Sequence, residues 1–416
     1  MVITRRQLLK GGISLLPALA FLSAPWRREI LFASSALAAT PADRTLVVVQ
    51  QAGGNDGLNT IIPYSDGHYY DLRPNIAIPQ EEVLPLNNEV GFHPELVKFK
   101  TLWDKGNLAI VEGVGYSLPS LSHFQSMDIW RFADPEVKVR QGWLGRYLET
   151  LDGSRGDVFP GLAVGRTLPL ELYSPQVSVT IVESLSLYQF QGDSRYPDAT
   201  QGRTEALSGI YDAAPQDSPY AALFHNTLGA THQSSAALMQ ADKAYQPGVD
   251  YPDSSLAGGL RILAEAITGN LGVRVGHVTI GGWDTHANQK PDHARLLRTL
   301  SEALYAFYQD LKAHGKDGDV LIMTWSEFGR RVTSNASDGT DHGTAVPVFF
   351  LGTPVKGGFY GQRPDLGSLS SNNLRFTTDF RTVYATVLEG WFKTPPDAIL
   401  GKQFETLPIF NAGMPV

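Results

Sequence analysis

Short apolar runs rich in β-branched residues recur along the chain, and they constrain its fold more than any other feature. They cover residues 45–50, 108–111, 177–182, 275–280, 320–324 and 346–351. Strands of a buried parallel sheet have this composition, because both of their faces are covered. Patterns typical of helices separate them, at residues 94–105, 122–133, 143–151, 221–245, 254–268, 292–314 and 379–392. The alternation predicts an α/β fold, a three-layer α/β/α sandwich around a mostly parallel central sheet.

The first 38 residues are predicted to be a twin-arginine signal peptide. Arg5 and Arg6 precede an apolar stretch at residues 11–24, and the Ala-Leu-Ala at residues 36–38 suits a signal peptidase. We therefore expect a periplasmic or extracellular protein, exported by the twin-arginine translocase, with no stable membrane span in its mature form. Two alternatives stay open: a membrane-spanning helix, which prolines and early charges oppose, and a signal that is kept as an anchor.

The composition excludes several classes of site. The chain has no cysteine among 416 residues and a net charge of −8 at pH 7. Disulfides, thiolate metal sites and cysteine nucleophiles are therefore excluded, and any metal must bind nitrogen or oxygen. There is no basic run outside the signal, so we expect no nucleic-acid partner. Residues 39–416 are expected to form a single domain, with loop insertions near 65–92 and 193–218.

Polar motifs follow the predicted strands, at the edge where an open parallel sheet binds its ligands. Asp56 follows the first strand, Asp284 and His286 follow the strand at 275–280, and Glu327 follows the strand at 320–324. A carboxylate and an imidazole two residues apart in extended chain point to the same side, as two ligands of one ion require. The same edge is expected to receive His342, just before the strand at 346–351. Each motif alone also fits an ordinary turn, but together they predict one polar cleft.

Two further motifs offer groups for chemistry. Ser122 opens a predicted helix and is followed by His123. Serine is a preferred helix cap, but the same place puts its hydroxyl at the positive end of the helix dipole, where an alkoxide or oxyanion is stabilised. Arg330 and Arg331 follow Glu327 and are candidate contacts for an anion, although the motif alone fits a solvated helix face with an intrahelical ion pair better.

The order of these motifs resembles the bacterial family named domain of unknown function 1501. The motifs are Gly-Gly-Asn-Asp-Gly, Ser-His-Phe, Trp-Asp-Thr-His, Ser-Glu-Phe-Gly-Arg and Asp-His-Gly, followed by a closing Asp-Phe-Arg-Thr-Val-Tyr-Ala helix. The resemblance runs from about Arg44 to about Phe392. That family is similar to the alkaline phosphatase and sulfatase superfamily, in which a hydroxyl-type nucleophile faces a divalent metal site. The resemblance thus implies an alkaline-phosphatase-like fold.

The resemblance also implies roles for individual residues. It implies a divalent metal ion, such as zinc, manganese or calcium, with the ligands Asp56, Asp284, His286, Glu327 and His342. It implies Ser122 as the nucleophile, with His123 and Arg330 as further catalytic candidates that contact the anion.

Two departures from the superfamily pattern change these expectations. Glu327 is followed by Phe328 where the superfamily usually has histidine, so a single-metal or oxygen-rich site is plausible. In the stretch Ser117-Leu118-Pro119-Ser120-Leu121, leucine stands where sulfatases have arginine, so we do not expect Ser117 to be converted to formylglycine.

We therefore expect an exported metal-dependent hydrolase of a small anionic ester, of the phosphate or sulfate type. Its nucleophile is the Ser122 hydroxyl or a metal-bound water. One alternative is a catalytically inactive exported binding protein that keeps the fold and binds a carbohydrate or a protein. Another is an esterase of the Ser-Gly-Asn-His type, suggested by Gly54-Asn55-Asp56 but opposed by the lack of a Gly-Asp-Ser block at the first strand.

Overall fold

The computed structural model describes residues 44–151, 158–185, 188, 199–212 and 221–412. The predicted signal peptide at residues 1–38 lies outside the described residues, as do 193–198 and 213–218 of the second predicted insertion. Thr40–Val416 form one compact unit. Within the described ranges, no helix combines the length and the apolar character needed to cross a membrane.

A nine-stranded sheet forms the centre of this unit. Its order is β11-β5-β10-β9-β1-β8-β6-β7, and β12 also pairs with β5. All pairings are parallel except those of β10, which runs antiparallel to both β5 and β9. The prediction of a mostly parallel sheet is thus confirmed. The strands are β1 (Thr45–Ala52), β5 (Leu108–Gly115), β6 (Gly161–Val164), β7 (Thr180–Val182), β8 (Val275–Gly281), β9 (Val320–Trp325), β10 (Val346–Leu351), β11 (Gly358–Tyr360) and β12 (Thr378–Asp379).

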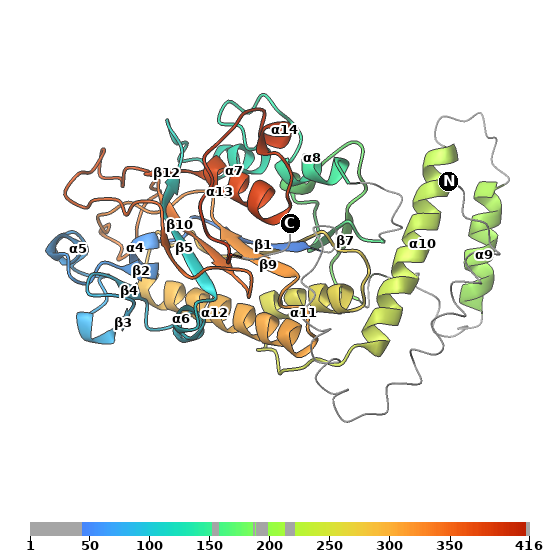
Figure 1. The fold of residues 1–416 in the computed structure, drawn as a ribbon, viewed down its shortest axis with the longest axis horizontal. Helices are drawn as coiled ribbons and strands as arrows, with labels where there is room; N and C mark the ends of the chain where they lie inside the picture. Colours follow the sequence, from blue (N-terminus) through green and yellow to red (C-terminus); the bar gives the residue numbers. More distant parts are fainter. Residues whose placement is uncertain (1–43, 152–157, 186–187, 189–198, 213–220, 413–416) are drawn as a thin grey trace. The chain divides into compact units, whose positions relative to one another are not determined.

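Both faces of the sheet are buried, which explains the continuous apolar composition of its strands. Along β1, Val47 and Val49 enter one hydrophobic core, and Leu46 and Val48 enter the other. In Figure 1, helices α6, α11 and α12 lie along one side of the sheet, and α7, α8, α13 and α14 lie along the other. The three-layer α/β/α architecture is therefore confirmed.

The described residues form eleven α-helices, of which seven fall close to predicted ones and four (the first two, the sixth and the last) were not predicted. They are α4 (Gly57–Thr60), α5 (Gly67–Leu72), α6 (Val97–Asp104), α7 (His123–Phe132), α8 (Trp143–Glu149), α9 (Ala199–Asp212), α10 (Ala221–Ala244), α11 (Ser255–Thr268), α12 (Gln289–Ala313), α13 (Phe380–Thr386) and α14 (Pro396–Leu400), with short 3-10 or π segments η3 (Gln80–Glu82), η5 (Leu170–Leu172) and η6 (Val387–Trp391). Helix α9 lies within the stretch predicted as a loop insertion. The other predicted insertion, residues 65–92, holds α5, η3, β3 (Leu84–Pro85) and β4 (Gly91–Phe92), and the last two form a small sheet with β2 (Ile61–Ile62).

The direction of β10 decides where the site lies. Because β10 is antiparallel to β9, its first residue lies at the same sheet edge as the last residues of the parallel strands. The loop that joins β9 to β10 therefore stays at that edge, beside the loops that leave β1 and β8. The ends of four strands converge there, as the sequence predicts.

Candidate metal centre

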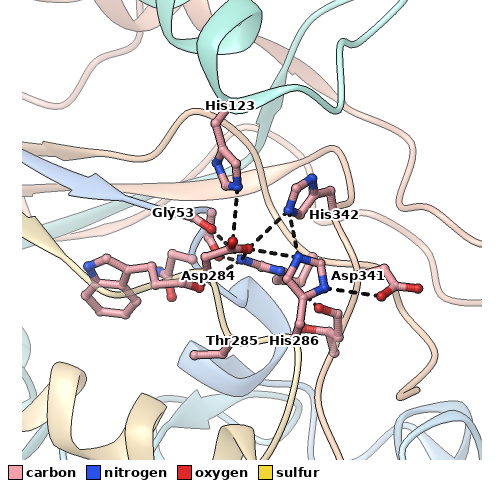
Figure 2. Close-up of polar contacts among 12 residues, drawn as sticks. Gly53, His123, Asp284, Thr285, His286, Asp341 and His342 are labelled. Carbon is pink, nitrogen blue, oxygen red and sulfur yellow. Dashed lines mark hydrogen bonds and ion pairs between the residues drawn. The ribbon is translucent and has the colours of Figure 1, made fainter. Parts of the chain in front are cut away.

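Three histidines and one aspartate meet at this edge of the sheet. Asp284 Oδ1 lies 3.0 Å from His286 Nε2 and 3.1 Å from His342 Nε2, and Asp284 Oδ2 lies 3.4 Å from His123 Nε2. Figure 2 shows the three imidazole rings turned toward the Asp284 carboxylate. The residues come from the loop after β8, the loop before β10 and the first position of α7. The structure thus brings together Asp284, His286 and His342, which were predicted as metal ligands, and His123, which was predicted as a catalytic residue.

Each histidine uses its other ring nitrogen to contact an acceptor. His123 Nδ1 lies 2.8 Å from Glu327 Oε1, His342 Nδ1 lies 2.7 Å from the Leu121 carbonyl, and His286 Nδ1 lies 3.3 Å from Asp341 Oδ1. A carbonyl or an ionised carboxylate accepts and cannot donate, so each Nδ1 carries the hydrogen. In the neutral rings the three Nε2 atoms then present lone pairs toward Asp284. Histidines that bind metals in proteins are held in this way.

The contacts among the Nε2 atoms fit a cation between them. His286 Nε2 and His342 Nε2 are 2.9 Å apart, a distance at which two lone pairs repel unless a proton or a metal ion lies between them. His123 Nε2 is buried and has no hydrogen-bond partner. Ligand atoms of His123, Asp284 and His342 all lie within 4.8 Å of one another, so one ion can reach them. Imidazole nitrogen and carboxylate oxygen are ligands that zinc accepts, so these residues fit a divalent metal.

Neighbouring groups lower the pKa of Asp284 and raise the pKa of His123. Burial raises the pKa of Asp284, but the hydrogen bond and charge of Arg330 outweigh it and lower that pKa to about 2. The hydrogen bond that His123 donates to Glu327 raises the pKa of His123 above its usual range, although burial opposes this shift. Asp284 is therefore available as an anionic ligand at neutral pH.

Arg330 supports the site from behind. Its side chain is fully buried, and Nη2 lies 2.6 Å from Asp284 Oδ1. The guanidinium also donates to four backbone carbonyls, those of Gly53, Gly54, Trp283 and Thr340. All of its hydrogen-bonding groups thus face the protein. This geometry favours a role in holding Asp284, and not the direct contact with an anion that the sequence suggests.

Glu327 lies one step behind the ligands. It is 0% exposed, and its Oε1 accepts hydrogen bonds from Gly53 N at 2.9 Å and from His123 Nδ1 at 2.8 Å. Gly53 has φ +127°, and a Cβ there would lie 2.5 Å from Asp284 N, so only glycine fits this approach. Glu327, predicted as a metal ligand, thus points its carboxylate at His123 Nδ1. The sequence interpretation assigned His123 to contact with the anion.

Asp56 does not join the histidines. Its Oδ2 lies 2.5 Å from Arg73 Nη1, in an ion pair whose two side chains are 1% exposed or less. Its Oδ1 accepts from the backbone N–H groups of Leu58 and Asn59 and caps helix α4. Burial raises the pKa of Asp56, but Arg73 outweighs it, so that pKa lies below its usual range. Asp56, predicted as a metal ligand, lies apart from the histidines because Arg73, 17 residues later in the chain, pairs with its carboxylate.

Ser122 keeps its position as the residue before helix α7. Its side chain makes no capping hydrogen bond and is exposed to solvent, next to His123. The hydroxyl thus lies at the start of a ten-residue helix. Asp341, Leu121 and Thr285 were not predicted as site residues. For Asp341, its place beside His342 in the Asp-His-Gly motif was an available signal.

A cavity of about 330 Å³ lies at the start of β10, apart from the predicted residues. Its walls are mainly apolar and include Leu58, Ile61, Val346 and Leu374. None of the predicted site residues lines it, so this cavity is separate from the candidate metal centre.

Comparisons with solved structures give remote matches. Ps i-CgsB in complex with k-i-k-neocarrahexaose has 11% identity and a TM-score of 0.35, over 87% of this chain and 73% of that chain. The PsFucS1 sulfatase from Pseudoalteromonas sp. has 12% identity and a TM-score of 0.35, over 84% and 72%. The lipoteichoic acid synthase LtaP from Listeria monocytogenes has 10% identity and a TM-score of 0.33, over 81% and 75%. At these scores, the chemistry of the site has to be argued from its own residues.

No curated protein matches the chain. The family described as protein of unknown function (DUF1501) matches residues 118–393, about two thirds of the chain. The matched segment contains all three histidines and the aspartate of the candidate metal centre. This chain belongs to the DUF1501 family.

Proposed function

We propose that this protein is an exported hydrolase that uses a divalent metal ion to cleave an anionic ester of the phosphate or sulfate type. One observation carries the proposal: three histidine Nε2 atoms converge on Asp284 while each Nδ1 is held by an acceptor. The 2.9 Å between His286 Nε2 and His342 Nε2 requires a proton or a cation between the two nitrogens, and a divalent ion meets that requirement.

The proposed ligands are His123, Asp284, His286 and His342. A divalent ion held by them would act as a Lewis acid toward an ester oxygen and lower the pKa of a nearby hydroxyl or water. Calcium prefers six to eight oxygen ligands, about twice what this site offers in total, whereas zinc and manganese accept imidazole. The ligand set therefore favours zinc or manganese over calcium.

The charge of the site supports an anionic substrate. Asp284 is already neutralised by Arg330 at 2.6 Å, and the three histidines are neutral when they bind a metal. A dication at the Nε2 atoms would concentrate positive charge at a partly exposed point, where it attracts a phosphate or sulfate group, while the carboxylates of Glu327 and Asp341 lie on the opposite side of the His123 and His286 rings.

Residues of this chain supply the remaining steps. The Ser122 hydroxyl, exposed at the start of α7, is the proposed nucleophile, and the helix N-terminus stabilises negative charge that develops near it. Glu327 and the Leu121 carbonyl fix the rings of His123 and His342 through Nδ1. In the net reaction one water adds across the ester bond, which releases an alcohol and the inorganic anion.

The location is part of the proposal. The twin-arginine pattern at residues 1–38 supports export of a folded protein to the periplasm or extracellular space. Metal loading before export agrees with a site that forms only when three distant loops have folded together.

Activity on generic aryl phosphate and aryl sulfate esters tests the proposal. The metal-loaded protein should hydrolyse one class, Ser122→Ala should lose at least about a hundredfold in kcat with unchanged metal content, and His342→Ala should lose both. Ser368→Ala, an exposed serine elsewhere, is the matched control. If the metal-loaded protein cleaves neither class, the hydrolase proposal fails.

A second candidate is an exported binding protein that keeps the metal but has no turnover. The observation that favours it is that the Ser122 side chain makes no capping bond and that, among the described residues, it has no hydrogen bond to a general base. This candidate predicts metal binding in the wild type without hydrolysis of either ester class.

A further inference from the structure

We infer that Gln289 is a positioning residue that holds two ligand-bearing loops of the metal centre in register, an inference that rests on the proposed function. Gln289 is the first residue of α12 and is 0% exposed. Its side chain touches neither the histidines nor Asp284, yet its hydrogen bonds reach both loops that supply those residues. It would therefore act through other residues and not on the substrate.

The amide of Gln289 joins the two loops through two threonines. Its Oε1 accepts from Thr285 Oγ1 at 3.0 Å and from Thr340 Oγ1 at 2.5 Å. Thr285 stands between the proposed ligands Asp284 and His286, and Thr340 stands two residues before His342. One carbonyl oxygen thus connects the loops that carry three of the four proposed ligands.

The backbone of the two loops is also in close contact. Thr340 N donates to the Thr285 carbonyl at 3.2 Å, and Gln289 N donates to the Asp338 carbonyl at 2.8 Å. A Cβ at Gly339 would collide with the His286 backbone, so the loops approach as closely as glycine allows. The Gln289 amide therefore bridges the two loops at the point where their backbones are already in direct contact.

Asp56 fixes the orientation of the amide. Gln289 Nε2 donates to Asp56 Oδ2 at 2.5 Å, and that carboxylate is ion-paired with Arg73. An ionised carboxylate only accepts, so the NH₂ of Gln289 must face Asp56 and its oxygen must face the threonines. Arg73 in turn donates from Nε to the Val332 carbonyl at 2.8 Å. The Gly-Gly-Asn-Asp-Gly motif thus contributes to the metal centre through a buried chain of contacts, without coordinating the ion.

The test compares Gln289→Met, which keeps the side-chain length but removes both kinds of hydrogen bond, with Thr285→Val and Thr340→Val. Thr299→Val on the same helix, whose hydroxyl bonds only the Arg295 carbonyl, is the matched control. Hydrogen exchange by mass spectrometry should show faster exchange in peptides covering 284–288 and 338–343 for the three variants, with β10 unchanged. The dissociation constant for Co²⁺ should rise about 10- to 100-fold, as for loss of a residue that orients metal ligands, and the visible Co²⁺ spectrum should change.

Unchanged loop exchange in Thr285→Val and Thr340→Val would overturn the inference, even if Gln289→Met fails to fold. The inference would also be overturned if a folded Gln289→Met variant had the same Co²⁺ spectrum and the same Co²⁺ affinity as the wild type. Faster loop exchange in a protein whose wild type binds no Co²⁺ would support the role of Gln289 in joining the loops while refuting the proposed metal function.

Discussion

Replacing Glu327 by glutamine tests whether Glu327 binds the metal directly or orients the metal ligand His123. In the structure Glu327 Oε1 accepts from His123 Nδ1 at 2.8 Å and from Gly53 N at 2.9 Å. The oxygen of a glutamine can accept both hydrogen bonds, and its NH₂ faces Ser326 Oγ, now 3.3 Å from Oε2. The substitution therefore removes the negative charge behind His123 and leaves the packing intact.

The expected size of the effect follows from this role. Removing a partner behind a metal-binding histidine typically weakens metal affinity about 10- to 100-fold. That change corresponds to about 1.4 to 2.8 kcal/mol of binding free energy. Loss of a direct ligand would instead weaken binding by several further orders of magnitude, because an open coordination position remains.

Calorimetric titration of chelator-treated protein with Zn²⁺ measures this difference. We expect Glu327→Gln to raise the dissociation constant about 10- to 100-fold, with the exposed Glu405→Gln as control. A dissociation constant within twofold of the wild type would refute the orienting role of Glu327. Complete loss of binding in a folded variant would instead make Glu327 a ligand, as the sequence suggests.

Three further predictions concern the ligands and the buried charges. His286→Ala should lose Zn²⁺ binding with little change in stability, because its side chain is 45% exposed; titration and thermal unfolding check this. Arg73→Met should lower the unfolding free energy by about 3 to 5 kcal/mol, because it leaves Asp56 charged and buried, and Arg73→Met with Asp56→Asn should recover part of that loss in urea unfolding. Burial raises the pKa of Glu265 to about 7. Its ionised form therefore destabilises the fold increasingly as pH rises from 4.5 to 7. Glu265→Gln should thus be more stable than the wild type by about 3 kcal/mol at pH 8 and equally stable near pH 4.5.

The layers and strands of the fold could be predicted because each of them has a characteristic local composition. Runs such as residues 320–324 and 346–351 are buried on both faces, so their sequence is apolar throughout. The short strand β6 (Gly161–Val164) and helix α9 were missed, since the first is only four residues long and the second lies between glycine- and proline-bearing segments.

The site was predicted less completely, because its roles depend on partners distant in sequence. The Asp284–His286 spacing reveals a ligand pair through local geometry alone. No pattern around Asp56 predicts its ion pair with Arg73. No pattern around Glu327 predicts the hydrogen bond between its carboxylate and His123, over 200 positions earlier. Motif order therefore located the site, whereas long-range contacts assigned its ligands.

The most direct test of the account is the metal content of the protein purified from its exported pool, measured by elemental analysis with the wild type beside a His123→Ala, His286→Ala, His342→Ala triple variant. We predict tightly bound zinc or manganese in the wild type and its loss in a folded triple variant. A wild type without a bound divalent ion, which also takes up none from added Zn²⁺ or Mn²⁺, would contradict the account.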